Sequence, residues 1–106
     1  MQNTKMFDKL PYIDFDIEFE TLVENNTQLQ TFCASITLLN QGNCGFNLNN
    51  SVDIPPGGSV TISYSGYGIP RLRNSISVMF NSDNTVTPKV QKLLITRTLI
   101  KTVCYE

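Results

Sequence analysis

Four acidic side chains occupy alternate positions along one short stretch of the chain. Their spacing is better suited to cation binding or ion pairing than that of the other residues. Asp14, Asp16, Glu18 and Glu20 occupy every second position of the run DFDIEFET. In an extended strand this spacing places the four carboxylates on one face, about 6.5–7 Å apart. They could hold a divalent cation or pair with a basic strand of another subunit. We favour a charged outer face that also discourages pairing of strand edges.

The side chains needed for nucleophilic catalysis are missing or isolated. The chain contains no histidine, so it cannot build a Ser-His-Asp triad and lacks the commonest general base. Its cysteines, Cys33, Cys44 and Cys104, match neither a disulfide scaffold nor a zinc pattern, and we expect packed structural thiols. We therefore expect no enzyme, no catalytic residue, no metal site and no cofactor.

Charge and hydropathy limit the partners. The net charge is −1, with 41% hydrophobic and 16% charged residues, which argues against strong attraction to nucleic acid or to an anionic membrane. No segment approaches the roughly 18 apolar residues of a membrane span, and the start lacks the apolar run of a signal peptide. We expect no nucleic-acid partner, no membrane insertion and synthesis in the cytoplasm. Arg71 and Arg73 are the best candidates for contacting an acidic partner.

Two-residue alternation interrupted by turn residues predicts an all-β fold. About six to eight strands at short intervals indicate a single antiparallel sandwich of immunoglobulin-like or jelly-roll type. The expected strands cover residues 14–21, 30–39, 44–49, 51–54, 59–65, 74–80 and 89–105.

Four local features of these strands lead to specific expectations. In the first strand Phe15, Ile17 and Phe19 should form the buried face of a half-buried strand. The turn at residues 40–43 should close a β-hairpin. The apolar phase of the last segment shifts near residues 93–94, which predicts a bulge or a bend, and its threonines favour a strand over the alternative helix across residues 90–100.

The first twelve residues form the part of the chain that lacks strand character. We expect an N-terminal arm over residues 1–12 and a sandwich domain over residues 13–106. The arm is too apolar for a solvated tail, so it should pack on its own core or on a neighbouring subunit. The expected subunit interface combines the arm with the charged clusters: Met6, Phe7, Leu10, Tyr12, Asp14, Asp16, Glu18, Arg71 and Arg73.

The window from about residue 38 to residue 65, with the core LNQGNCGFNLNNSVDIPPGGSVTI, resembles small β-sandwich structural proteins of bacteriophage virions. That resemblance implies a capsid decoration, spike or minor capsid protein, located in the virion and made in the host cytoplasm. Its partners would be copies of itself and other virion proteins, with a host surface glycan as a further partner of a spike. Within the window, Pro55 and Pro56 should end a strand, and Gly57 and Gly58 should turn the chain.

A second interpretation is a carbohydrate- or peptide-binding module. Tyr64 and Tyr67 flank or lie within the loop of residues 66–70 and could offer aromatic rings to a ligand.

Overall fold

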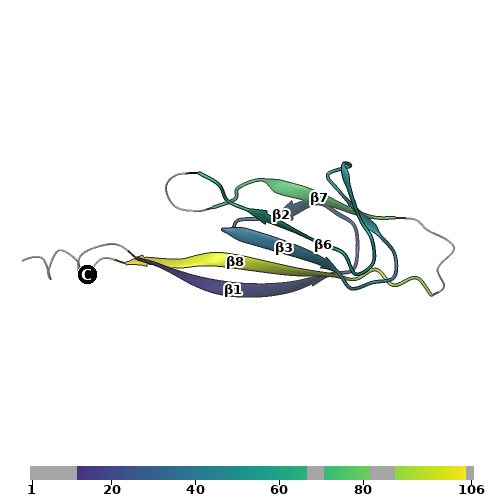
Figure 1. Cartoon of the computed structure of the whole chain (residues 1–106), viewed down its shortest axis with the longest axis horizontal. Helices are drawn as coiled ribbons and strands as arrows, with labels where there is room; N and C mark the ends of the chain where they lie inside the picture. Colours follow the sequence, from purple (N-terminus) through teal and green to yellow (C-terminus); the bar gives the residue numbers. More distant parts are fainter. Residues whose placement is uncertain (1–11, 67–70, 82–87, 105–106) are drawn as a thin grey trace, which may run out of the picture.

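The computed structural model describes residues 12–66, 71–81 and 88–104, and within these ranges the side chains from residue 14 to residue 100. These ranges contain eight strands and no helix, arranged as two antiparallel four-stranded sheets that face each other (Figure 1). The all-β sandwich is therefore confirmed. None of the described segments is a helix long and apolar enough to cross a membrane. The strands are β1 (Tyr12–Leu22), β2 (Asn26–Gln30), β3 (Ser35–Asn40), β4 (Phe46–Leu48), β5 (Val52–Ile54), β6 (Ser59–Ser63), β7 (Ser75–Phe80) and β8 (Leu93–Cys104).

The strand order follows from a chain that is doubled back on itself. Sheet A has the order β1-β8-β3-β6, and sheet B has the order β2-β7-β4-β5. First strand pairs with last, second with seventh, third with sixth and fourth with fifth. The midpoint is the three-residue turn of residues 49–51, in which Asn49 and Asn50 have positive φ angles of 53° and 55°. Successive pairs therefore alternate between the two sheets.

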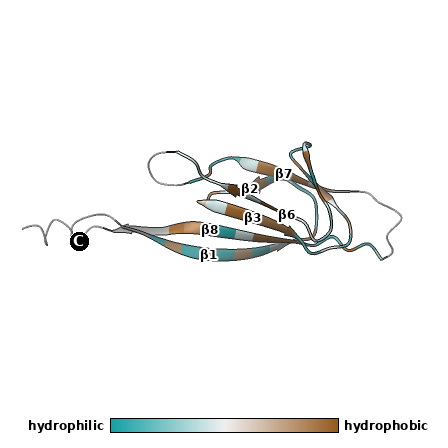
Figure 2. Ribbon diagram, in the orientation of Figure 1, coloured by the Kyte–Doolittle hydropathy of each residue, from teal (hydrophilic) through white to brown (hydrophobic). Residues whose placement is uncertain are grey.

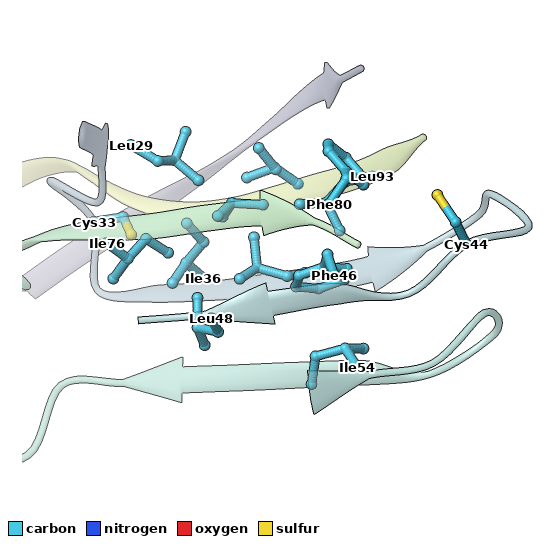
Figure 3. Packing of buried hydrophobic residues seen from close by; sticks show 13 residues of the cluster. Leu29, Cys33, Ile36, Cys44, Phe46, Leu48, Ile54, Ile76, Phe80 and Leu93 are labelled. Atoms are coloured by element: carbon cyan, nitrogen blue, oxygen red, sulfur yellow. The ribbon is translucent and has the colours of Figure 1, made fainter. Parts of the chain in front are cut away.

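The core fills the space between the inner faces of the sheets (Figure 3). Alternate residues of β4 and β7 point inward, as their sequence pattern predicts, and the rings of Phe46 and Phe80 meet edge to face at 6.2 Å. The buried cluster consists of Leu29, Cys33, Ile36, Leu38, Cys44, Phe46, Leu48, Ile54, Ile76, Val78, Phe80, Leu93 and Ile95.

Two sequence predictions fail between β2 and β4. The expected strand over residues 30–39 is broken, because the chain crosses from sheet B to sheet A at residues 31–34, where Phe32 has a φ of 38°. The turn at residues 40–43 closes no hairpin, since β3 belongs to sheet A and β4 to sheet B. The buried Asn40 side chain stabilises this crossing, because it donates to the carbonyls of Cys44 and Ile54 at 2.9 and 3.2 Å.

The last segment is one long strand, as predicted. The helix considered for residues 90–100 is absent, and β8 pairs along its length with β1. Burial alternates without interruption through Leu93, Ile95 and Arg97, so the bulge expected near residues 93–94 is wrong. The register shifts instead between Asp14 and Phe15 of the partner strand.

The Pro-Pro-Gly-Gly corner turns the chain, as its residue types predict. Gly57 adopts a φ of 81°, and the Gly58 amide donates to the Pro55 carbonyl at 2.9 Å. Backbone hydrogen bonds of 2.9 Å join Asn40 to both glycines and fix the corner against the end of β3. The corner thereby carries the chain from β5 in sheet B to β6 in sheet A.

Candidate functional site

Strand β1 presents its apolar residues to solvent. Phe15, Ile17 and Phe19 are 49%, 58% and 65% exposed, so the expectation that they form a buried face is wrong. Glu18 lies opposite Arg97 in the register, and cross-strand neighbours share one face of a sheet. Since Arg97 is buried, the acidic row points toward the inside of the sandwich and the apolar row points outward.

The reason for this orientation is visible in the outline of the molecule. Strands β1 and β8 extend together beyond the shorter strands (Figure 1), and hydrophilic and hydrophobic residues alternate along β1 (Figure 2). The inner face of β1 meets an open hollow, lined on its other side by β2. Acidic side chains remain hydrated in this hollow, whereas in a closed core they would be desolvated at a large cost.

Arg97 joins the two sheets at this hollow. Its guanidinium donates from Nε and Nη2 to the Gln30 carbonyl of β2, at 3.2 and 2.9 Å. Its Nη1 donates to Glu20 Oε1 at 2.6 Å and to Glu18 Oε1 at 3.3 Å. One guanidinium therefore holds two carboxylates of sheet A and one backbone carbonyl of sheet B. The two carboxylates leave one uncompensated negative charge beside it.

The hollow has a volume of about 420 Å³ and a mixed lining. It combines carboxylates and amide side chains with the exposed ring of Phe32. Such groups accept and donate hydrogen bonds to hydroxyls, and an aromatic face packs against apolar surface. The lining residues are Glu18, Glu20, Asn26, Gln28, Leu29, Gln30, Thr31, Phe32, Arg97 and Leu99.

The opposite surface of sheet A, here called the outer face, carries no charged side chain among those that the structure describes. It consists of the exposed apolar row of β1 followed by rows made mainly of hydroxyl side chains, with Leu39, Leu94 and Ile100 among them. In these rows Thr37 and Thr61 are hydrogen-bonded at 2.9 Å. The register places fourteen side chains on it: Phe15, Ile17, Phe19, Thr21, Leu94, Thr96, Thr98, Ile100, Ser35, Thr37, Leu39, Ser59, Thr61 and Ser63.

The cysteines with described side chains are structural. Cys33 and Cys44 are free and buried, as expected, and burial raises the pKa of the Cys33 thiol. A raised pKa keeps the thiol protonated, which makes it a poor nucleophile. The described part of the chain contains no group of three or more Cys, Asp and Glu side chains that could hold a metal ion.

The remaining predicted interface residues lie apart from the hollow or outside the described ranges. Arg71 and Arg73 are exposed, and the ion pairs of Glu18 and Glu20 are made with Arg97. Tyr64 is half-buried. Met6, Phe7, Leu10 and Tyr67 fall outside the described residues, as does the side chain of Tyr12, the first residue of β1.

Sequence reasoning missed Arg97, although a signal for it exists. Counting every second position from Leu93 passes through Ile95 and reaches Arg97, so the arginine occupies an inward position of its strand. An inward arginine needs acidic or carbonyl partners, and the acidic row supplies them. Comparison with protein-family models, curated proteins and solved structures gives no match, so the functional argument depends on this geometry.

Proposed function

We propose that the sandwich is a jelly roll and that the protein is a non-enzymatic structural component of a bacteriophage virion. It would act through subunit contacts as a capsid-associated, decoration or spike protein, with copies of itself and other virion proteins as partners. The strand pairing supports the jelly roll, since all four nested pairs of a doubled chain alternate between sheets. An immunoglobulin-like sandwich would combine its strands in a different order.

The exposed row of Phe15, Ile17 and Phe19 is the observation that carries the functional part of the proposal. Jelly rolls occur in viral capsids but also in lectins and cupins, so the fold alone does not determine the function. Three large apolar side chains on one strand face form a patch of the kind that marks interaction surfaces. A protein that works by covering this row fits a subunit of an assembly better than a free enzyme.

Mass spectrometry of purified phage particles from the source culture tests this proposal. We expect peptides of this chain at a constant ratio to the major coat protein across the particle peak of a density gradient. A chain that stays at the top of the gradient, away from the particles, would contradict a virion role.

The hollow beside Phe32 favours a second candidate function, the binding of a carbohydrate or peptide. Binding on a glycan or peptide array that is lost in Phe32→Ala but kept in Tyr67→Ala would place the ligand in the hollow. Loss only in Tyr67→Ala would place it in the loop of residues 66–70 instead. A blank array would leave assembly as the better supported function.

A further inference from the structure

The apolar row of β1 has the same residue order in both directions. It is a Phe–Ile–Phe row centred on Ile17, with its three side chains on the outer face of sheet A. A two-fold axis through Ile17 would therefore place Phe15 of one copy on Phe19 of a second copy. Interfaces between identical subunits of a dimer use one patch twice, which requires this kind of self-complementarity.

We propose that the partner of the outer face is a second copy of this chain, packed face to face about a two-fold axis at Ile17. The inference rests on the proposed function, because it names one of the subunit contacts through which the protein would act. The dimer buries both apolar rows against each other and stacks the outward side chains of β8 on those of the second copy.

The charges of the described side chains favour stacked faces over paired edges. Antiparallel edge pairing of two β1 strands centred on Ile17 would use an axis perpendicular to the sheet and would set Asp16 opposite Glu18 of the second copy, and Asp14 opposite Glu20. Like charges directly opposite each other in a sheet destabilise the pairing. Stacking through the uncharged outer face keeps the two acidic rows on opposite sides of the dimer.

The axis at Ile17 limits the contact to the long strand pair β1 and β8. Their eleven register pairs span about 36 Å, because each residue advances the strand by about 3.3 Å. Ser35 and Ser63 lie level with Ile17 in the register, and the rest of β3 and β6 runs to one side of it, so the stacked part of each sheet is two strands, or about 10 Å, wide. A standard protein interface uses about 800 Å² of each partner, and this strip is smaller, so we expect a dimer of micromolar rather than nanomolar affinity.

Cross-linking of Ile17→Cys tests the position of the axis. The variant is made in a Cys104→Ser background, so that its other thiols, Cys33 and Cys44, are buried. Packed sheets lie about 10 Å apart, so a bismaleimide with a spacer of about that length should join two copies. Direct oxidation should not, because a disulfide needs Cα atoms closer than about 7 Å. We expect more than half of the Ile17→Cys protein to migrate as a covalent dimer after treatment with the bismaleimide, but not after oxidation.

Thr21→Cys in the same background is the matched control. It lies on the same strand and face, four residues from the axis, so its two copies would be about 26 Å apart. We expect less than a tenth of this variant to cross-link. Equal yields for both variants would show random collision and would overturn the inference.

The other outcomes also overturn it. A direct Ile17→Cys disulfide would indicate edge pairing, and a monomer by light scattering with no cross-link would exclude a self-contact. Cross-linking to a different protein inside particles would assign another occupant to the face. The dimer is measured on the purified protein, so a missing dimer would not contradict the virion proposal. Likewise, a protein that is missing from phage particles would not contradict the dimer.

Discussion

At the scale of single residues, Arg97 is the side chain whose role depends most on its surroundings. It is 7% exposed at the end of the core, and it forms ion pairs with two carboxylates that are half exposed. Exposed ion pairs contribute little to stability, so the main part of its contribution comes from the two donors to the Gln30 carbonyl. This bridge holds β2 of sheet B against β8 of sheet A.

Replacing Arg97 should therefore loosen the contact between the sheets. We expect Arg97→Leu to lower the free energy of unfolding by about 2 kcal/mol, measured by urea denaturation, because the Gln30 carbonyl loses both donors. Arg97→Lys should restore less than half of this loss, since an ammonium cannot reproduce the planar fork. Arg71→Leu, at an exposed position, should change stability by less than about 0.5 kcal/mol. A wild-type stability of Arg97→Lys would show that charge alone, without the fork, holds the sheets.

Four asparagines have a second structural role at this scale, because their side chains join segments that are distant in the sequence. Asn25, Asn43 and Asn49 each accept a backbone N–H from another segment, with distances of 2.7 to 2.8 Å. Asn40 joins the two crossings between sheets from a buried position. The sequence predicts a turn at residues 40–43 but none of these hydrogen bonds, because the partners of amide side chains are fixed only after distant segments have met.

At the scale of elements, the strands themselves are predictable and their placement is not. Alternation identifies the strand at residues 74–80 because it depends on neighbours within the chain. The crossing at residues 40–43 resembles a hairpin turn, since the same turn residues serve either purpose. Which face of β1 is buried depends on where sheet B ends, a long-range property. The acidic row was predicted to form a charged outer face; its side chains are exposed, but Glu18 and Glu20 lie on the inner side and line the hollow.

Two glycines in these crossings are required for different reasons: Gly42 because a distant segment leaves no room for a side chain, and Gly57 because of its own backbone angle. A Cβ at Gly42 would collide with the Val90 carbonyl and lie 2.9 Å from the Lys92 nitrogen, both backbone atoms leading into β8. A Cβ at Gly57 would meet nothing within 4 Å, but the φ of 81° strains any other residue.

We expect Gly42→Ala to be the more damaging of the two substitutions. It should destabilise the fold by about 3 kcal/mol, because backbone must move to admit the methyl group. Gly57→Ala should cost about 1 kcal/mol, the strain of one residue in the left-handed region. Thermal unfolding of both variants measures the difference. A reversed order would mean that the segment before β8 moves aside more easily than the corner relaxes.

At the scale of the whole molecule, the distribution of charge differs between the two sides of sheet A. The described acids of β1 and the arginine of β8 lie on the inner side, and the outer side keeps hydroxyl and apolar groups. Glu18 and Glu20 therefore line the hydrated hollow, while the outer face has no charge among the described side chains. Such a division disfavours a free monomer and favours association through the outer face.

Association of this kind should appear in the thermal stability of the protein. A dimer that forms only from folded chains raises the melting temperature with concentration. For a domain of this size we expect about 3 °C for each tenfold increase, measured by differential scanning fluorimetry from low to high micromolar concentration. Ile17→Asp should abolish this dependence, because it brings two carboxylates together at the axis.

The control for this variant is Val52→Asp, an equally drastic change at an exposed position of β5 in sheet B. It should keep the concentration dependence of the wild type, because sheet B lies on the other side of the sandwich. Ile17 is 58% exposed, so its replacement by Asp should leave the melting temperature at the lowest concentration within about 2 °C of wild type. A melting temperature that stays independent of concentration in the wild type would argue against the dimer at this face.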